Sequence, residues 1–114
     1  MSARKRIAAL GGLSGVQEAS LLNLDGSVIV SSVDAPSLSR AASSLGSALQ
    51  ALQRALPDLG APMNLTLESE NGALHVAQAG DALIMLTTTR DANLGAVRLE
   101  LREAADELRA EHAG

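Results

Sequence analysis

The sequence predicts a three-layer α/β/α sandwich, an α+β fold in which helices cover both faces of one five-stranded, mostly antiparallel sheet. Three observations indicate this fold class. Apolar periodicities give the element order α-β-β-α-β-β-β-α, turn dipeptides join several strands directly, and two long helices each carry one apolar stripe. The 114 residues fit a single domain, residues 1–114, with no linker, repeat or low-complexity tract inside it.

The chain begins with a basic segment followed by a short apolar stretch, an order that imitates a secretory signal. The apolar stretch ends at the pair Gly11-Gly12, and polar residues follow soon after. We interpret about Ala3 to Leu10 as a short amphipathic helix with Ile7 and Leu10 on its apolar side. We therefore expect a cytoplasmic protein.

The first two strands form a predicted hairpin. One strand runs from about Val16 to Leu24, Asp25-Gly26 is a tight-turn dipeptide, and Ser27–Ser31 returns. The glycine-rich turn before this hairpin follows a helix and precedes a strand. A phosphate cradle needs the opposite order, so we interpret these glycines as a helix stop.

The second predicted helix begins near Pro36 and Ser37 and ends before Pro57, because proline is tolerated in a first turn but not inside a helix. Its leucines share one stripe at 100° per residue, which predicts that the helix covers a sheet face. The stripe consists of Leu38, Leu45, Leu49, Leu52 and Leu56.

Three further strands and a helix complete the chain. Met63–Glu68 alternates apolar and polar residues, Asn71-Gly72 is a strong hairpin turn, and Leu74–Ala79 returns. Ala82–Leu86 is a continuous apolar run, which is typical of a central strand covered on both faces. The last helix extends from near Asn93 to Leu108. We expect the first and last helices on one face and the second helix on the other.

Composition excludes several kinds of function. The chain has no cysteine and no aromatic residue, so thiolate metal sites and base-stacking platforms for nucleic acid are absent. Its 13 acidic against 9 basic residues disfavour binding to a phosphate backbone. Lys5 is the only lysine, and no P-loop motif is present. No apolar run approaches the roughly 18 residues of a membrane span. We expect no cofactor, no nucleic-acid partner and no membrane insertion.

Catalytic candidates are few. The two histidines, His75 and His112, do not belong to a metal-ligand cluster, and we interpret His75 as an outward polar residue of a strand. Glu68 and Glu70 resemble a carboxylate pair, but a solvated hairpin rim is the simpler explanation. A Ser–His–Asp triad assembled in space stays an alternative. We expect no catalytic, cofactor-binding or metal-binding residue, and no enzymatic activity of the chain itself.

One flank of the second helix carries only small residues, a pattern found where a second helix approaches closely and also where a helix lies low on a sheet. These residues, the small-residue seam, are Ser37, Ser44, Ala48, Ala51 and Ala55. The strand Met63–Glu68 follows a long connection, which favours a place at the sheet edge, where strands pair readily with other chains. A homodimer with a continuous sheet would use both features. Its predicted strand contacts are Met63, Leu65 and Leu67.

The back of the same helix is polar but sparsely charged, with serines between two arginines. This polar face consists of Arg40, Ser43, Ser47, Gln50 and Arg54. Simple solvent exposure explains such a face, yet arginine is also enriched in interface hot spots.

Two segments resemble a known family. Gly15–Gly26 resembles the opening hairpin of Roadblock domains, the family of dynein light chains and bacterial gliding-motility regulators. Gly80–Leu86, followed by Asp91–Arg98 with its Ala-Asn-Leu-Gly turn, resembles the last strand of that family and the entry into its C-terminal helix. The resemblance extends over essentially the whole chain in the same element order.

The resemblance implies a Roadblock/longin-like sandwich whose strands lie in the order second, first, fifth, fourth, third. It further implies dimers formed through the second helix and third strand. Bacterial members similar to the gliding regulator act on small Ras-like GTPases as activators or scaffolds, through the second-helix surface. Because this chain has no aromatic residue, aromatic partner anchors of some relatives cannot be carried over.

Two functions follow as expectations. The first is a homodimeric, non-enzymatic regulator of a small Ras-like GTPase, with the polar face of the second helix as the contact surface. We expect Arg40 and Arg54 to be contact residues rather than arginine fingers. The alternative is a structural adaptor or assembly subunit without effect on nucleotide turnover.

Overall fold

The structure is a computed structural model that describes residues 2–110. Its elements are α1 (Ala3–Gly11), β1 (Val16–Asn23), β2 (Val28–Ser31), α2 (Ser39–Ala55), the 3₁₀ turn η1 (Pro57–Leu59), β3 (Asn64–Ser69), β4 (Gly72–Ala79), β5 (Ala82–Thr89) and α3 (Leu94–Arg109). The predicted order of helices and strands is confirmed, and η1 is added in the connection after α2. His112 lies outside the described residues.

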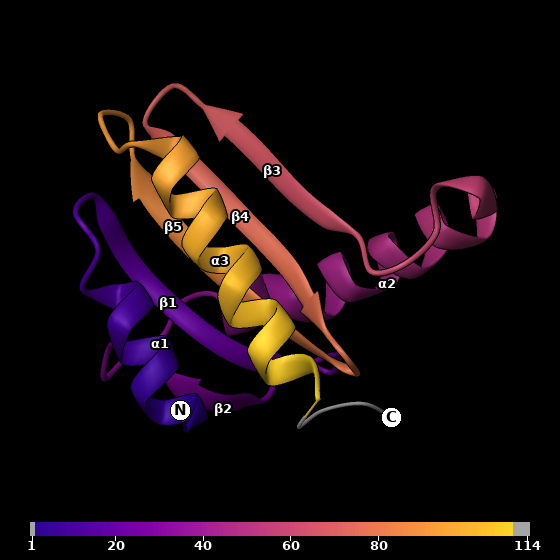
Figure 1. Cartoon of the computed structure of the whole chain (residues 1–114), viewed down its shortest axis with the longest axis horizontal. Helices are drawn as coiled ribbons and strands as arrows, with labels where there is room; N and C mark the ends of the chain where they lie inside the picture. Colours follow the sequence, from indigo (N-terminus) through magenta and orange to yellow (C-terminus); the bar gives the residue numbers. More distant parts are fainter. Residues whose placement is uncertain (1, 111–114) are drawn as a thin grey trace.

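The five strands form one sheet in the order β2-β1-β5-β4-β3, and every neighbouring pair is antiparallel (Figure 1). This is the order that the family resemblance implies. The strand β5 lies at the centre, as its apolar run predicts, and β3 lies at one edge. The strands β4 and β5 are longer than predicted, since Thr87–Thr89 continue the pairing. Threonine fits a pleated, half-buried surface.

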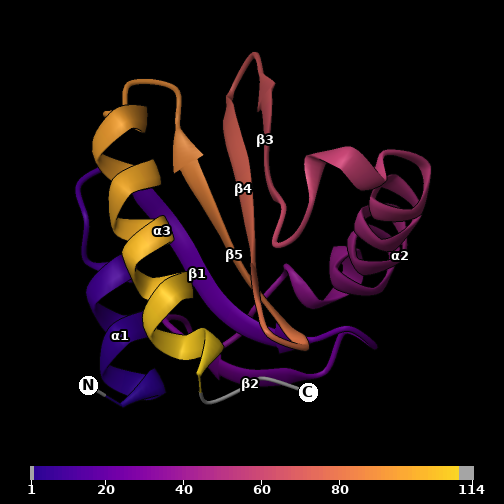
Figure 2. The ribbon, with the colours of Figure 1, turned by 45° about the vertical axis from the view of Figure 1, so that its right-hand side comes forward.

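The helices cover the two faces of the sheet as expected (Figure 2). On one face, α1 and α3 contribute Ile7, Leu10 and Leu101 to a core that also holds Ile84 and Leu86 of β5. On the opposite face, α2 covers a second core. Its buried members include Leu22, Leu49, Val76, Leu83 and Met85. The alternation of side chains along β5 divides its apolar run between the two cores.

The start of α2 is held by a carboxylate from the sheet. The helix begins at Ser39, later than predicted, and its N-cap residue Leu38 has no capping side chain. Buried Glu18 of β1 supplies the missing acceptor. Its carboxylate accepts from the Ser37 backbone N–H at 3.1 Å, from Ser37 Oγ at 2.8 Å and from the Leu38 N–H at 3.1 Å. A negative charge at a helix N-terminus is favourable, so Glu18 fixes where α2 leaves the sheet.

The last turns of α2 diverge from the edge strand β3 (Figure 2). The prediction that the whole leucine stripe covers the sheet is therefore wrong for these turns. Leu38 and Leu49 are buried, but Leu52 and Leu56 are 39% and 47% exposed. Periodicity identifies the apolar side of a helix without stating how far the surface beneath it extends. A twisted sheet rotates its edge strand away from a straight helix.

Candidate interaction surface

An apolar groove lies between the C-terminal half of α2 and the edge strand β3. It has a volume of about 350 Å³, and η1 closes one end. We call it the leucine groove; its lining residues are Leu49, Leu52, Leu56, Leu59, Pro62, Met63, Asn64 and Leu65. Leu59 is 72% exposed and Leu67, farther along β3, is 48% exposed. A contiguous exposed apolar patch on a small domain is typical of an interaction site.

The small-residue seam borders this groove. All five of its residues are exposed in the isolated chain. Ala48 and Ala55 stand four residues before and three after Leu52, so they lie beside it on the helix surface. Ala48 and Ala55 thus flank the groove that Met63 and Leu65 also line, and these two residues are half-buried on the α2 side of β3. Ser37, by contrast, precedes α2 and donates a hydrogen bond from its Oγ to Glu18 of β1, which lies three positions from β3 in the sheet.

The edge of β3 is open. This strand pairs with β4 only, so its second edge presents unpaired backbone groups. Within Asn64–Ser69 there is no lysine and no proline, the residues that proteins commonly use to protect such an edge. The edge can accept another strand, and the leucine groove lies directly beside it.

The polar face of α2 is accessible to solvent. All five of its residues are exposed, and within residues 2–110 neither Arg40 nor Arg54 forms an ion pair. The two guanidinium groups are separated by short serine side chains, so a partner can approach the helix between them. This face can bind an acidic partner surface, since arginine donates bidentate hydrogen bonds to carboxylates.

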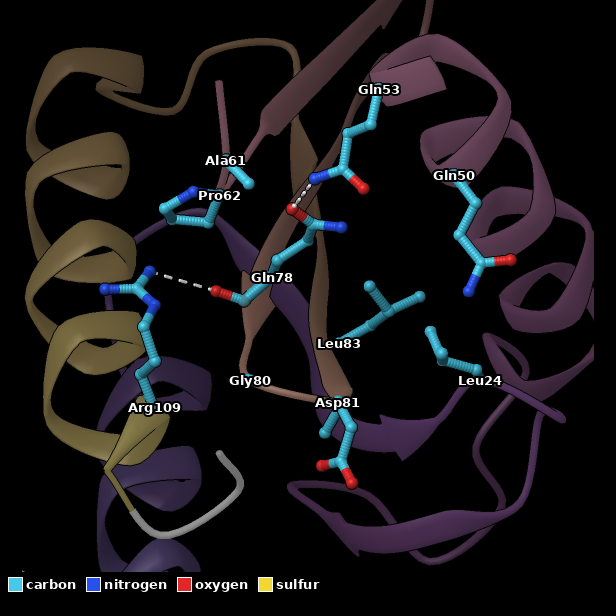
Figure 3. A pocket seen from close by; sticks show the side chains of 11 residues that line it. Leu24, Gln50, Gln53, Ala61, Pro62, Gln78, Gly80, Asp81, Leu83 and Arg109 are labelled. Carbon is cyan, nitrogen blue, oxygen red and sulfur yellow. Dashed lines mark hydrogen bonds between the residues drawn. The ribbon is translucent and has the colours of Figure 1, made fainter. Parts of the chain in front are cut away.

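Gln50 also lines a polar hollow of about 470 Å³ at the end of the sheet where β4 turns into β5 (Figure 3). There Gln78 Oε1 accepts from Gln53 Nε2 at 2.9 Å and from the Met63 N–H at 2.7 Å. Arg109 donates to the Gln78 carbonyl at 3.1 Å. These bonds tie α2, β4 and the start of β3 together. The side chains of Gln53 and Gln78 bond each other, so the hollow supports the fold, and its lining contains no serine, cysteine or histidine.

His75 is not the outward polar residue that the sequence suggested. It is fully buried beneath α3, with Nδ1 3.3 Å from Thr66 Oγ1 and Nε2 3.2 Å from Thr88 Oγ1. Burial lowers the pKa of His75, and the positive charge of Arg98 lowers it further, whereas Glu68 acts in the opposite direction. The strand alternation placed His75 with Ala77 and Ala79. The sequence predicted a helix layer on each face, but it did not show that α3 extends over β4 and covers His75.

The carboxylate pair of the β3–β4 hairpin lies in solvent. Glu68 and Glu70 are exposed, and Glu68 Oε1 is 3.6 Å from an Arg98 guanidinium nitrogen. In the part of the chain that the structure describes, no three histidine, aspartate or glutamate side chains gather in a way that could hold a metal ion. No helix among these residues is both long and apolar enough to cross a membrane.

Sequence reasoning missed the exposed leucines of the leucine groove, since it assigned Leu52 and Leu56 to the core and did not consider Leu59. The length of the leucine stripe could have identified them. The stripe continues to the end of α2, which is farther than the edge of the sheet extends beneath the helix. It also missed Glu18, whose partners lie 19 and 20 residues away in sequence.

Comparison with known proteins gives consistent results. The family model of the Roadblock/LC7 domain matches residues 5–89. The gliding protein MglB from Thermus thermophilus is 24% identical, with a TM-score of 0.80 over 96% of this chain and 87% of that chain. An MglB structure with a tetrameric arrangement is 25% identical, with a TM-score of 0.79 over 96% and 87%. Myxococcus xanthus MglB is 19% identical, with a TM-score of 0.79 over 96% and 93%. Among curated proteins, no sequence matches this chain.

Proposed function

The chain belongs to the Roadblock/LC7 domain family, and from that membership we propose that it forms a homodimer that binds and regulates a small Ras-like GTPase. The observation that carries the proposal is the juxtaposition of two accessible surfaces on the same helix. One flank of α2 borders the leucine groove and the open edge of β3, and the back of α2 carries unpaired arginines. A dimer that uses the first surface leaves the second free for a partner.

The dimer contacts in this proposal are the small-residue seam together with Met63, Leu65 and Leu67. Small side chains allow two copies of α2 to approach closely, and strand pairing at β3 satisfies the open backbone groups. Each exposed leucine of the groove that becomes buried contributes on the order of 1 kcal/mol to association. The neighbouring MglB structure with a tetrameric arrangement supports self-assembly within this fold.

The GTPase contacts in this proposal are Arg40, Ser43, Ser47, Gln50 and Arg54. The face offers hydrogen-bond donors and positive charge without an acid–base pair, so regulation proceeds through binding. A protein that binds one conformation of a GTPase more tightly shifts the GTPase towards that conformation. Acceleration of hydrolysis then depends on catalytic groups of the GTPase itself. The named gliding proteins of the same fold support a motility-related regulator.

The experiment is an affinity purification from source-cell lysate, with GDP or a non-hydrolysable GTP analogue added. We expect a small GTPase to bind preferentially with one nucleotide. Arg40→Glu/Arg54→Glu should reduce that binding by about tenfold or more, since charge reversal replaces two attractions by repulsions. The matched control is Arg4→Glu/Arg90→Glu, which reverses two exposed arginines outside α2.

Two outcomes would contradict the proposal. Binding that survives the α2 reversal as well as it survives the control would exclude the polar face as the contact surface. Recovery of the same partners under both nucleotides, with no GTPase among them, would favour a structural adaptor or assembly subunit instead. That alternative is consistent with a face that binds without reactive groups.

A further inference from the structure

We propose that the second copy adds to the open edge of β3 in one specific register, in which Thr66 faces Thr66 of the second copy and Arg102 forms an ion pair with Glu68 of the second copy. The proposal rests on the homodimer proposed above and adds what determines its alignment. Two observations support it. One is the pattern of side chains along β3, and the other is that, of two neighbouring arginines on α3, Arg98 forms an ion pair within the described residues and Arg102 does not.

The pattern of β3 limits the possible registers. Residues directly opposite each other in an antiparallel pair point to the same side of the sheet, so symmetric pairing sets one residue against its own counterpart. With Thr66 at that position, Leu65 faces Leu67 of the second copy twice, on the side of the leucine groove. The same register sets Asn64 against Glu68 of the second copy. Every residue from Asn64 to Glu68 then finds a partner inside the strand.

The neighbouring registers are less favourable. Setting Leu67 against itself moves Leu65 opposite Ser69. Both Leu65–Leu67 contacts of the Thr66 register are then lost, and a single Leu67–Leu67 contact replaces them. Setting Leu65 against itself also pairs Leu67 with Met63, but it moves Glu68 opposite Pro62, which has no N–H to offer to the strand ladder. Setting Glu68 against itself opposes two carboxylates, and like charges directly opposite are destabilising. The Thr66 register keeps apolar pairs, separates the carboxylates and draws all of these pairs from within β3.

The arginines of α3 point to the same alignment. Arg98 pairs with Glu68 of its own chain at 3.6 Å, near the C-terminal end of β3. One turn further along α3, Arg102 lines a hollow of about 210 Å³ together with Arg98, and this hollow reaches Asn64 near the other end of the strand. The helix therefore runs antiparallel to β3. Arg102 is exposed and, within residues 2–110, forms no ion pair.

The proposed register gives Arg102 the negatively charged partner that it does not have within its own chain. Opposite Asn64, beside the hollow that Arg102 lines, stands Glu68 of the second copy. Two-fold symmetry repeats the contact, so one dimer contains two such pairs. Each Glu68 then lies between Arg98 of its own chain and Arg102 of the other. An interaction of this kind selects alignment and partner more than it adds affinity.

The test mixes two charge-reversed variants, Arg102→Glu and Glu68→Lys, carrying different tags. Each variant alone opposes like charges at both contacts, whereas the mixed dimer restores opposite charges at both. Random pairing would make half of all dimers mixed, and we expect more than half. The ratio of the squared concentration of mixed dimers to the product of the two homodimer concentrations should rise by about tenfold or more at low salt. Native mass spectrometry counts the three species, and added salt should reduce the preference.

Arg98→Glu mixed with Glu68→Lys is the matched control. Arg98 faces residue 68 of its own chain, so this mixture should pair at random. A preference equal to that of the Arg102 mixture would place the contact elsewhere and overturn the assignment. Random pairing in the Arg102 mixture, from a wild-type protein that is dimeric, would exclude the register and leave the homodimer standing. A monomeric wild-type protein would instead remove the homodimer on which the register rests.

A cysteine variant tests the register without charge changes. Because the chain has no cysteine, Thr66→Cys introduces the only thiol. Residues that face each other across strands have Cβ atoms roughly 4.5–5.5 Å apart, close to disulfide range. Under mild oxidation we expect Thr66→Cys to form a covalent dimer at least about tenfold faster than Glu70→Cys, an exposed control outside the pairing. Equal rates would contradict the register.

Discussion

At the scale of single residues, two buried polar side chains connect parts of the fold that are distant in sequence. Glu18 and His75 are both almost completely buried, at 7% and 0% exposure. Buried polar groups are retained when they are hydrogen-bonded, and both have partners on other elements. Glu18 bonds the start of α2, and His75 connects the edge strand β3 to the central strand β5 through two threonines. Each residue thus joins layers or strands that are separate in the sequence.

The titration of His75 leads to a prediction about stability and pH. Burial lowers the pKa of folded His75 below its ordinary value of 6.5. As the pH falls below that value, the unfolded chain takes up a proton that folded His75 does not, so the free energy of unfolding decreases. The decrease is at most about 1.4 kcal/mol per pH unit and ends at the folded pKa.

Urea unfolding at pH 7.5 and pH 5.5 measures this effect. His75→Gln removes the titrating group at a cost in hydrogen bonding, so it should be less stable at pH 7.5 but lose less stability on acidification. A wild-type protein and a variant with the same pH dependence would show that another group is responsible.

At the scale of elements, α2 is the helix whose position decides the surface. Its N-terminus is held by Glu18, and its last turns diverge from the edge strand. The sequence predicted the helix, its approximate end and its apolar stripe. It did not predict where contact with the sheet stops, because that depends on the twist of strands far away in sequence.

Weakening the Glu18 anchor tests this account of α2. Glu18→Gln retains the shape of the side chain but removes the charge and one acceptor, and should destabilise the fold by about 1–2 kcal/mol. Hydrogen exchange at the Ser37 and Leu38 amides, which donate to the carboxylate, should become faster. Glu70→Gln, on the exposed hairpin, is the matched control and should change neither quantity. Unchanged exchange in Glu18→Gln would mean that the helix start is held by other contacts.

At the scale of the whole molecule, the three-layer sandwich has one side that is incomplete as a monomer. The edge of β3, the leucine groove and the small-residue seam lie together there, whereas α1 and α3 complete the opposite face. The proposed homodimer covers this side and leaves the polar face of α2 exposed. The function proposed here therefore depends on the assembly state.

A charge in the seam tests this assembly. Ala48 is exposed in the isolated chain, so Ala48→Asp should leave the stability of the monomer within about 0.5 kcal/mol of a matched surface change. In a dimer the new carboxylate would be buried beside its counterpart, and the dissociation constant should rise by about a hundredfold or more.

The control is Ser47→Asp, which places the same side chain one residue away, on the polar face of α2. Light scattering after size-exclusion chromatography, over a range of concentrations, gives the molar mass of each variant. A dimer that persists in Ala48→Asp as it does in Ser47→Asp would exclude the small-residue seam from the interface.

The sequence by itself determined the order of elements, the hairpin turns at Asp25-Gly26 and Asn71-Gly72, the central place of Ala82–Leu86 and the family. These features depend on residues within a few positions of one another, where periodicity and turn preference act directly. Only the tertiary structure decided that α3 buries His75, that Glu18 holds α2, and that Leu52 and Leu56 are left exposed. Those outcomes depend on the twist of the sheet and on contacts between distant segments, and local pattern carries no information about either.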